Sequence, residues 1–391
     1  MIAVIADDLT GAAEIGGIAL RHGLRVVMDT KVHRHDKIDV MIVATDARSK
    51  NEKEAQDLIF QVTKELINLR PDFIFKKTDS LLRGNVAEEL LAQMHASGKN
   101  KVLLIPANPA LKRTIKNGIY YSQNIPLNES DLADASRRKI ATSCVLDLIG
   151  DKYKSITKIL SLGDKIPENG LIIGNTATEK DLECWAKVID NDTIPAGSGG
   201  FFNAFLKCIA SVANQEKNEE LIVGKKIIYV CGSAFPLSKA SVKEAHTLGR
   251  VVSYLPKDIF CPGVNETKMI ENWASEIIKG LDEKGNVIVA VDGLECNTIP
   301  DISNKIREHM AGVIEKVMLT VQVNELVIEG GATASSIIDK LHYERFFPKQ
   351  ELAHGVLRMS VQENENLFLT MKPGSYQWPS AIWNQPDYSY N

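Results

Sequence analysis

The sequence predicts an α/β protein with two α/β domains that contain mainly parallel sheets. Short apolar runs recur along the chain, and most are continuous rather than alternating, as is typical of strands buried on both faces. Longer amphipathic stretches separate these runs, which indicates that helical crossovers connect successive strands. The runs form two series, and 391 residues is enough chain for two domains of ordinary size.

The first series predicts a domain over residues 1–213. Its apolar runs are rich in leucine and β-branched residues, and its helical stretches carry an apolar stripe. The expected strands are residues 1–6, 24–28, 40–44, 72–75, 102–105 and 171–173. The expected helices are residues 52–69, 87–97 and 179–188. Residues 119–136 read as a long irregular loop or arm, and their length favours a functional role.

The second series predicts a domain over residues 227–391. The intervening residues 214–226 are rich in Glu, Lys and Asn, so we expect them to form a linker region. The expected strands are residues 227–230, 251–255, 287–291, 326–328 and 367–371. The expected helices are residues 239–247 and 268–281.

Composition argues against several functional classes. Fifty acidic and 46 basic residues give a net charge of −4, which provides no long-range attraction for nucleic acid or an anionic membrane. No apolar run approaches the ~20 residues of a membrane helix. The start of the chain lacks a basic leader, and six scattered cysteines form no CxxC pair. We therefore expect a cytoplasmic protein with reduced thiols and assign no metal ligands.

Two adjacent carboxylates, Asp7 and Asp8, follow the first predicted strand directly. Ligands of open α/β sheets lie beyond the carboxyl ends of the strands, where these residues would stand. One carboxylate could orient a substrate hydroxyl and accept its proton, while the other binds a second hydroxyl or a metal. Alternatively, Asp8 or Thr10 caps the next helix. The pattern by itself leaves both interpretations open.

A dense group of charged residues follows the fourth predicted strand. Lys76, Lys77, Asp79, Arg83 and Asn85 lie within ten residues. Arginine can hold a planar carboxylate through two parallel hydrogen bonds, and lysine acts as a compact point charge. A solvated basic turn is the alternative, but the position after a buried strand favours an anion-binding loop.

The next strand leads into residues 106–118, which offer further polar side chains. Asn108 and Asn117 could form the directional hydrogen bonds that polyols need. Asn-Pro and Asn-Gly pairs are also ordinary turn sequences. This stretch alone therefore does not decide between binding and turn formation.

Glycine-containing turns follow three strands of the second series. Gly232 and Ser233 follow the first, although the chain contains no P-loop sequence. Residues 329–334, EGGATA, combine paired glycines, a hydroxyl and a helix start, a good backbone cradle for phosphate. Residues 372–375 place a lysine and a glycine near the same sheet edge. Close helix–strand packing is the alternative explanation for the glycines.

Taken together and in this order, these segments resemble the four-carbon acid sugar kinase family. The resemblance extends over nearly the whole chain. Its two specific segments are ADDLTGA at 6–12 and KKTDSLLRGN at 76–85. The others are TDARS at 45–49, PANPALKRTIKNG at 106–118, CGS at 231–233, EGGATA at 329–334 and KPGS at 372–375.

The resemblance implies a sugar-acid-binding N-terminal domain, a nucleotide-binding C-terminal domain and an active-site cleft between them. It implies phosphorylation of the C4 hydroxyl of a threonate-, erythronate- or 3-oxotetronate-like acid. The reaction would use ATP and Mg²⁺, and the protein could form a homodimer. The implied catalytic residues are Asp7, Asp8, Lys77 and Arg83. The implied substrate-binding residues are Asp46, Arg48, Asp79, Asn85, Asn108 and Asn117. The implied ATP-site residues are Ser233, Gly330, Gly331, Ala332, Thr333, Lys372 and Gly374.

The chain departs from the family pattern mainly in its second half. Ala332 stands where the family usually has an acidic residue after the paired glycines, and Phe235 replaces a serine. Bulkier residues, Ser375 and Tyr376, follow the Lys-Pro-Gly turn. Two alternatives therefore remain: a non-catalytic sensor of sugar acid or nucleotide with the same fold, and a kinase of another small hydroxy acid.

Overall fold

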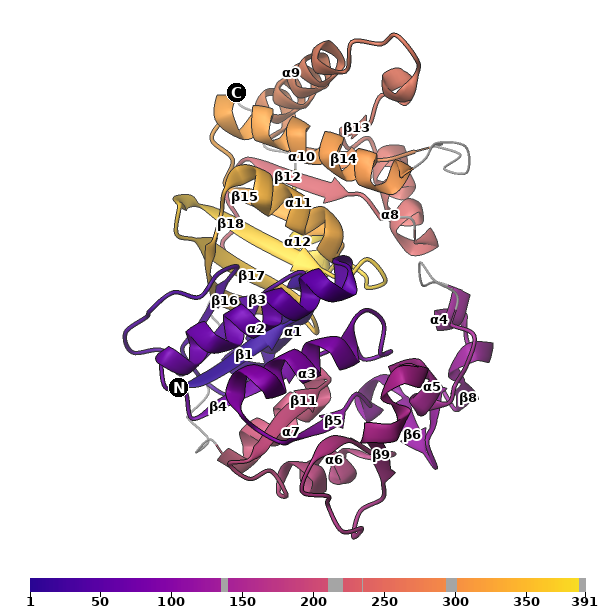
Figure 1. Ribbon diagram of the computed structural model, residues 1–391. Coiled ribbons are helices and arrows are strands. Elements are labelled where there is room, and N and C mark those ends of the chain that lie inside the picture. Colours follow the sequence, from indigo (N-terminus) through magenta and orange to yellow (C-terminus); the bar gives the residue numbers. More distant parts are fainter. Residues whose placement is uncertain (135–139, 210–220, 234, 293–300, 387–391) are drawn as a thin grey trace. The chain divides into compact units, whose positions relative to one another are not determined.

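A computed structural model describes residues 1–134, 140–209, 221–233, 235–292 and 301–386. The chain divides into two compact units, Met1–Glu216 and Lys217–Asn391, and each contains a mostly parallel sheet with helices (Figure 1). The predicted α/β class is therefore confirmed. Of the expected linker, residues 214–220 lie outside the described residues, and residues 221–226 form no regular element.

The first unit contains an eight-stranded parallel sheet with the order β2-β3-β1-β4-β11-β5-β10-β9. Its strands are β1 (Ile2–Ala6), β2 (Val26–Asp29), β3 (Val40–Ala44), β4 (Phe73–Lys77), β5 (Lys101–Ile105), β9 (Thr157–Leu160), β10 (Gly170–Gly174) and β11 (Thr193–Gly197). Its longer helices are α1 (Leu9–Arg21), α2 (Glu52–Asn68), α3 (Val86–Ser97), α6 (Glu179–Ala186) and α7 (Gly199–Ile209).

Local sequence explains where these elements begin and end. All five residues of β1 are buried, as the continuous apolar run predicts. Helix α2 begins with a capping box in which Asn51 and Glu54 satisfy each other's backbone amides. Helix α3 ends at Gly98, whose φ of 72° is the left-handed conformation that glycine adopts without strain.

The register of the sheet aligns the carboxyl ends of several neighbouring strands. Ala6 of β1 lies opposite Ala44 of β3 on one side and Lys77 of β4 on the other. Gly197 of β11 lies opposite Lys77 and Ile105. The segments that follow β1, β3, β4 and β5 therefore emerge along the same edge of the sheet.

Helices cover both faces of this sheet. Helices α2 and α3 pack against each other, and α7 packs against both α1 and α6 (Figure 1). Phe75 of β4 contacts the rings of Phe201, Phe202 and Phe205 on α7, with ring centroids 5.0–6.0 Å apart. This aromatic cluster fixes the strand that carries the charged segment at its carboxyl end.

A small antiparallel sheet extends into the stretch that was expected to be irregular. Its strands are β6 (Arg113–Lys116), β7 (Ile119–Ser122) and β8 (Ile125–Pro126), followed by the short helices α4 (Asp131–Asp134) and α5 (Val145–Ile149). The expectation of an irregular loop over 119–136 was thus wrong for β7 and β8, and residues 135–136 lie outside the described residues.

The second unit has the strand order β13-β14-β12-β15-β18-β17-β16, and β17 runs antiparallel to both of its neighbours. Its strands are β12 (Ile227–Cys231), β13 (Val252–Tyr254), β14 (Asn286–Ala290), β15 (Glu325–Glu329), β16 (Arg345–Ala353), β17 (Val356–Val361) and β18 (Asn364–Lys372). Its helices are α8 (Pro236–Thr247), α9 (Glu266–Lys284), α10 (Ile302–Thr320), α11 (Gly331–Leu341) and α12 (Ser380–Trp383).

In the second sheet, the carboxyl ends of the strands that precede the glycine turns are also aligned. Cys231 of β12 lies opposite Glu329 of β15, which in turn lies opposite Lys372 of β18.

Five cysteines are free thiols, and Cys296 lies outside the described residues. Within the described part of the chain, no helix is both long and apolar enough to cross a bilayer.

We predict that Gly197→Ala destabilises the first unit by about 2 kcal/mol or more. Gly197 has φ 150°, and a Cβ there would lie 2.1 Å from the backbone oxygen of Ile105. Gly163→Ala is the matched control, because Gly163 also has a positive φ (95°) but has no atom within 4 Å of its Cβ position. Thermal unfolding of both variants measures the difference, and equal losses for the two would contradict the steric argument.

Candidate active site

Asp7 and Asp8 lie at the carboxyl end of β1, and one arginine holds both carboxylates. The Arg48 Nε donates to Asp7 Oδ2 at 2.8 Å, and its Nη1 donates to Asp8 Oδ2 at 2.8 Å. Arg48 comes from the segment after β3, the neighbour of β1 in the sheet. The pairing requires the folded sheet, because 40 residues separate Arg48 from Asp8.

Asp8 also caps helix α1. Its Oδ1 accepts a hydrogen bond from the Gly11 backbone amide at 2.7 Å, and its Oδ2 accepts one from the Thr10 hydroxyl at 2.7 Å. The capping interpretation is therefore confirmed, and it coexists with the ion pair to Arg48. Burial by itself raises the pKa of Asp8, but Arg48 and Lys77 outweigh this effect, so the pKa lies below its usual value. Asp8 stays ionised at neutral pH.

Asp79 joins the same cluster from the end of β4. Its carboxylate accepts two hydrogen bonds from the Arg83 guanidinium, each 2.7 Å long, and lies 3.5 Å from Arg48. Burial raises the pKa of Asp79, but the charge of Arg48 and the hydrogen bonds from Arg83 reverse this effect, and the net pKa is well below its usual value. Arg48 and Arg83 therefore both hold Asp79 ionised.

The two lysines at the end of β4 point to opposite faces of the sheet, as successive strand residues do. Lys77 Nζ lies 3.3 Å from Glu14 on α1, whereas the buried Lys76 Nζ lies 2.7 Å from Glu89 on α3. Burial lowers the pKa of Lys77, but Glu14, Asp7 and Asp8 together raise it above the usual value. Lys77 is thus a charged member of the Asp7–Asp8 cluster, and Lys76 belongs to the layer behind it.

Gly11 supplies the space that this cluster needs. A Cβ at position 11 would lie 2.7 Å from Asp8 Oδ1 and 3.2 Å from Lys77 Nζ. A side chain here would displace the two charged groups that were predicted to face the substrate. The glycine of the ADDLTGA segment therefore has a steric role in the site.

Three other predicted substrate residues lie in different surroundings. Asn85 donates to the backbone oxygens of Ala47 and Lys50 and so fastens the segment that carries Arg48. The carboxylate of Asp46 accepts the Ser49 hydroxyl at the start of a short 3₁₀ helix. Asn108 is buried after β5, and its Oδ1 has no hydrogen-bond partner.

Asn117 forms part of a tight turn. It is exposed at the tip of the β6–β7 hairpin with φ 49°, and Gly118 beside it has φ 75°. Two successive positive φ values are the signature of a tight hairpin turn that Asn-Gly favours. The turn explanation left open by the sequence accounts for this residue.

In the second unit, the predicted ATP-site residues converge at the carboxyl ends of β12, β15 and β18. A Cβ on Gly374 would lie 2.7 Å from Ser233 Oγ, and a Cβ on Gly232 would lie 2.9 Å from Thr333 Oγ1. Gly330, with φ 91°, is the N-cap of helix α11. These contacts bring two glycine turns and a helix N-terminus together, an arrangement suited to phosphate.

A buried ion pair lies beneath this glycine-lined group. Lys372 Nζ lies 3.3 Å from Glu329 Oε1, and each side chain is only 1% exposed. Burial lowers the pKa of Lys372 in spite of Glu329, and burial also raises the pKa of the neighbouring Cys231 thiol. Gly331 begins helix α11, and Ala332 is exposed in its first turn.

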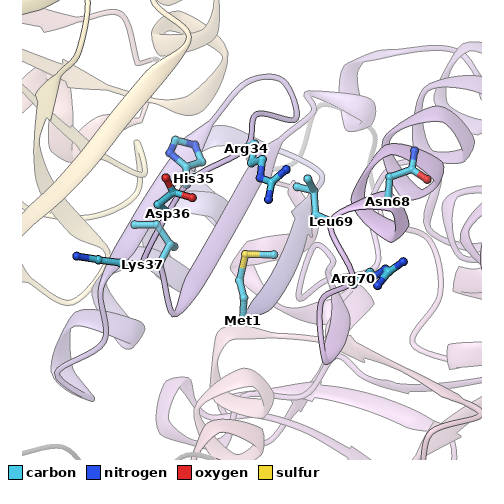
Figure 2. A pocket seen from close by; sticks show the side chains of 9 residues that line it. Met1, Arg34, His35, Asp36, Lys37, Asn68, Leu69 and Arg70 are labelled. Carbon is cyan, nitrogen blue, oxygen red and sulfur yellow. The ribbon is translucent and has the colours of Figure 1, made fainter.

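A cavity lies away from both groups of predicted site residues. It measures about 560 Å³ and is lined by Met1, Arg34, His35, Asp36, Lys37, Ile38, Asn68, Leu69 and Arg70 (Figure 2). Met1 precedes β1, whereas Asp7 follows it, so the cavity is at the opposite end of the strand from the charged cluster. It contains none of the predicted site residues.

Sequence reasoning missed several members of both groups. Glu14 lies on α1, facing Lys77, outside the quoted motifs. Glu329 pairs with Lys372 and opens the EGGATA segment, but no role was predicted for it from the sequence. Thr78 Oγ1 is buried without a hydrogen-bond partner beside Lys77. An acidic residue at the end of an otherwise apolar strand was the available indication for Glu329.

Comparison with known proteins identifies the class. A model of a sugar-binding N-terminal domain matches residues 2–205, and a model of a nucleotide-binding C-terminal domain matches residues 228–376. The chain belongs to the four-carbon acid sugar kinase family, as its motifs predicted. The two matched ranges contain the charged cluster and the glycine-lined group, respectively.

Individual relatives are similar at low identity. The 3-oxo-tetronate kinase of Haemophilus influenzae is 22% identical over 96% of this chain and 97% of its own length. The D-erythronate kinase of Heliobacterium modesticaldum is 23% identical over 62% of this chain, and the D-threonate kinase of Salmonella typhimurium is 24% identical over 51%. The chain spans 59% and 52% of the lengths of these last two relatives.

Solved structures show the same fold. A crystallised Haemophilus influenzae protein gives a TM-score of 0.71 at 20% identity and covers 97% of this chain and 98% of its own. A Salmonella typhimurium protein gives a TM-score of 0.79 at 17% identity, with 98% of each chain covered.

We predict that Asp79→Asn lowers the free energy of unfolding at pH 7 by roughly 3 kcal/mol, because Arg48 and Arg83 lose their shared carboxylate. The folded pKa of Asp79 lies below the unfolded value of about 3.9, so its contribution is present above that pH and is lost as the pH falls below it.

The difference in the free energy of unfolding between Asp79→Asn and the unsubstituted protein should therefore stay constant from pH 7 to about 5. Below about pH 4 this difference should become smaller. Urea unfolding at several pH values measures it. Asp57→Asn is the control, since the exposed Asp57–Lys53 pair contributes at most about 1 kcal/mol. A gap that widened on acidification would contradict the ion-pair assignment.

Proposed function

We propose that this protein is a kinase that uses ATP to phosphorylate the terminal C4 hydroxyl of a four-carbon sugar acid such as threonate, erythronate or 3-oxotetronate. The observation that carries the proposal is the Asp7–Asp8 pair held by Arg48 at the end of β1, within a range that matches a sugar-binding domain. The kinase names of the full-length and partial relatives agree with it.

Asp8 is the better candidate to meet the acceptor hydroxyl. Its side chain is 13% exposed, whereas that of Asp7, which also contacts Arg48, is 2% exposed. A carboxylate with a lowered pKa is a weak base but a good hydrogen-bond acceptor. Phosphoryl transfer passes through a loose transition state in which positioning outweighs proton removal, so a weak base is sufficient.

The glycine-lined group of the second unit is suited to the ATP phosphates. Gly232, Gly330 and Gly374 keep side-chain atoms away from the backbone, and the N-terminus of α11 supplies amides and a favourable dipole. The described residues contain no cluster of three His, Cys, Asp or Glu side chains for a metal. Mg²⁺ would enter this protein with the ATP phosphates, where it offsets their charge.

The buried Lys372 provides the cation of that group. Its Nζ lies beside Glu329 and 4.8 Å from the ring centroid of Trp378. Burial favours the neutral amine, and an incoming phosphate would favour the ammonium form, so phosphate binding and the charge of Lys372 are coupled. The reaction requires that the sugar acid and the γ-phosphate meet during turnover. The proposal also fits a cytoplasmic setting, where ATP is available.

We predict that Asp8→Asn lowers kcat by roughly 10²- to 10⁴-fold without loss of folding. Asparagine keeps the N-cap of α1 but removes the charge that pairs with Arg48, so the thermal midpoint should fall although the variant still folds. The assay couples ADP release to a panel of threonate, erythronate and 3-oxotetronate isomers, with glycerate and longer aldonates included. Mass analysis of the product identifies the acceptor.

Asp72→Asn is the control for this experiment, because Asp72 lies at the amino end of the sheet and pairs with the N-terminus. Its turnover should match that of the unsubstituted protein. Full activity in Asp8→Asn would contradict the role proposed for Asp8. Phosphorylation of glycerate alone would favour the alternative that the protein is a kinase of another small hydroxy acid.

We also predict that Lys372→Met weakens Mg-ATP binding about 10-fold or more, because it removes the buried cation beneath the glycine turns. Titration calorimetry measures the dissociation constant. Lys340→Met is the control, since Lys340 is half-exposed on α11 and pairs with Glu315. If the unsubstituted protein binds no ATP at millimolar concentration, the non-catalytic sugar-acid sensor becomes the better explanation.

A further inference from the structure

The charged cluster at the end of β1 has no surplus positive charge for an anionic substrate. Its carboxylates are Asp7, Asp8, Glu14 and Asp79, and its cations are Arg48, Lys77 and Arg83. Every one of the three cations lies within 3.5 Å of a carboxylate. Four carboxylates against three cations would repel a sugar acid's carboxylate rather than hold it.

Arg113 is a cation of the same region that has no carboxylate partner among the described residues. Its Nη1 donates one hydrogen bond, 2.6 Å long, to the hydroxyl of Ser80. Ser80 directly follows Asp79, so this guanidinium lies beside the charged cluster. A guanidinium has five donor hydrogens in a planar fork that matches a carboxylate, and a single neutral acceptor leaves most of them available.

The backbone fixes where Arg113 stands. Its amide donates to the Asn108 oxygen at 3.0 Å, and the Asn108 amide donates to the Arg113 oxygen at 2.8 Å. Residues directly opposite each other in an antiparallel pair project their side chains to the same face. Tyr120 reinforces this position, because its hydroxyl donates to the Ser80 backbone oxygen at 2.6 Å.

Two buried polar atoms at the same edge of the sheet also lack partners. Asn108 is 3% exposed, and its Oδ1 accepts no hydrogen bond; Thr78 is 1% exposed, and its Oγ1 is likewise unpaired. Leaving such groups unpaired costs about 1–3 kcal/mol each, which a ligand hydroxyl can recover. Both residues follow strands at the carboxyl edge that carries the cluster.

We propose that Arg113 binds the carboxylate of the sugar acid and that Asn108 accepts a hydrogen bond from one of its hydroxyls. This inference rests on the proposed function and deepens it by naming the group that selects acids over neutral polyols. Arg48, Lys77 and Arg83 then hold the protein's own carboxylates in place. The substrate carboxylate lies at the Arg113 end, and the acceptor hydroxyl lies toward Asp8.

The test compares a four-carbon acid with tetritols, its neutral polyol counterparts, in the full-length chain. Arg113→Gln keeps a donor for Ser80 but removes the charge, so we expect KM for the acid to rise about 100-fold or more. KM for ATP should stay within about threefold. The preference for acid over tetritol should fall by a similar factor, because the neutral polyol never used the charge.

Two further variants separate binding from a structural role. Tyr120→Phe removes the other side-chain hydrogen bond to Ser80 and should lower the thermal midpoint with little change in the acid preference. Arg113→Lys should recover part of the affinity for the acid. Calorimetry with the acid alone gives a readout independent of turnover.

An Arg113→Gln protein that keeps the full preference for acid over tetritol would overturn the assignment of Arg113 while leaving the kinase proposal intact. The same conclusion follows if Tyr120→Phe and Arg113→Gln reduce the preference equally. If the unsubstituted chain phosphorylates no acid, the kinase proposal fails, and acid binding by calorimetry still tests Arg113.

Discussion

The charged site of the first unit depends on the guanidinium of Arg48. Asp7, Asp8 and Asp79 leave two neighbouring strands at the same edge of the sheet, and their mutual repulsion would be about 4 kcal/mol per pair at 4 Å in a partly buried setting. Arg48 arrives from the third strand and contacts all three carboxylates. The strand order β3-β1-β4 places this cation beside the middle strand. From there it reaches the two carboxylates that follow β1 and the one that follows β4.

This arrangement keeps ionised carboxylates in a site where burial alone would neutralise them. Burial raises the pKa of Asp8 and Asp79, and the surrounding cations more than reverse that effect. The consequence is that the cations of the motif are occupied by the protein itself. Recognition of an anionic substrate then requires a cation outside this set, which is why the pairing of Arg113 with a serine matters.

The candidate site of the second unit contains fewer charged side chains than that of the first. This candidate phosphate site consists mainly of glycine turns and a helix N-terminus. The buried cation of that site, Lys372, already has a carboxylate neighbour. Backbone amides carry no net charge and cannot be neutralised by a nearby side chain. A site of this kind can accept a highly charged phosphate chain without a surplus of lysines or arginines.

Much of the architecture could be predicted, because continuous apolar runs and amphipathic helices are local patterns. Strand β11 could not, since its sequence, TIPAG, contains the proline and glycine that normally argue against a strand. The residue type of Asn117 allows both a binding role and a turn, and its place at the tip of a hairpin is a matter of backbone conformation.

The apolar runs and amphipathic stretches by themselves determined the α/β class, and the motifs determined the family and most of the residues that gather at the two sheet edges. Only the tertiary structure decided which charges neutralise one another. Residue type and spacing fix what a side chain can donate or accept, whereas an ion pair depends on distances between segments that are tens of residues apart. Lys76 and Lys77 are adjacent and chemically identical, yet the alternation of the strand sends one to Glu89 and the other to Glu14.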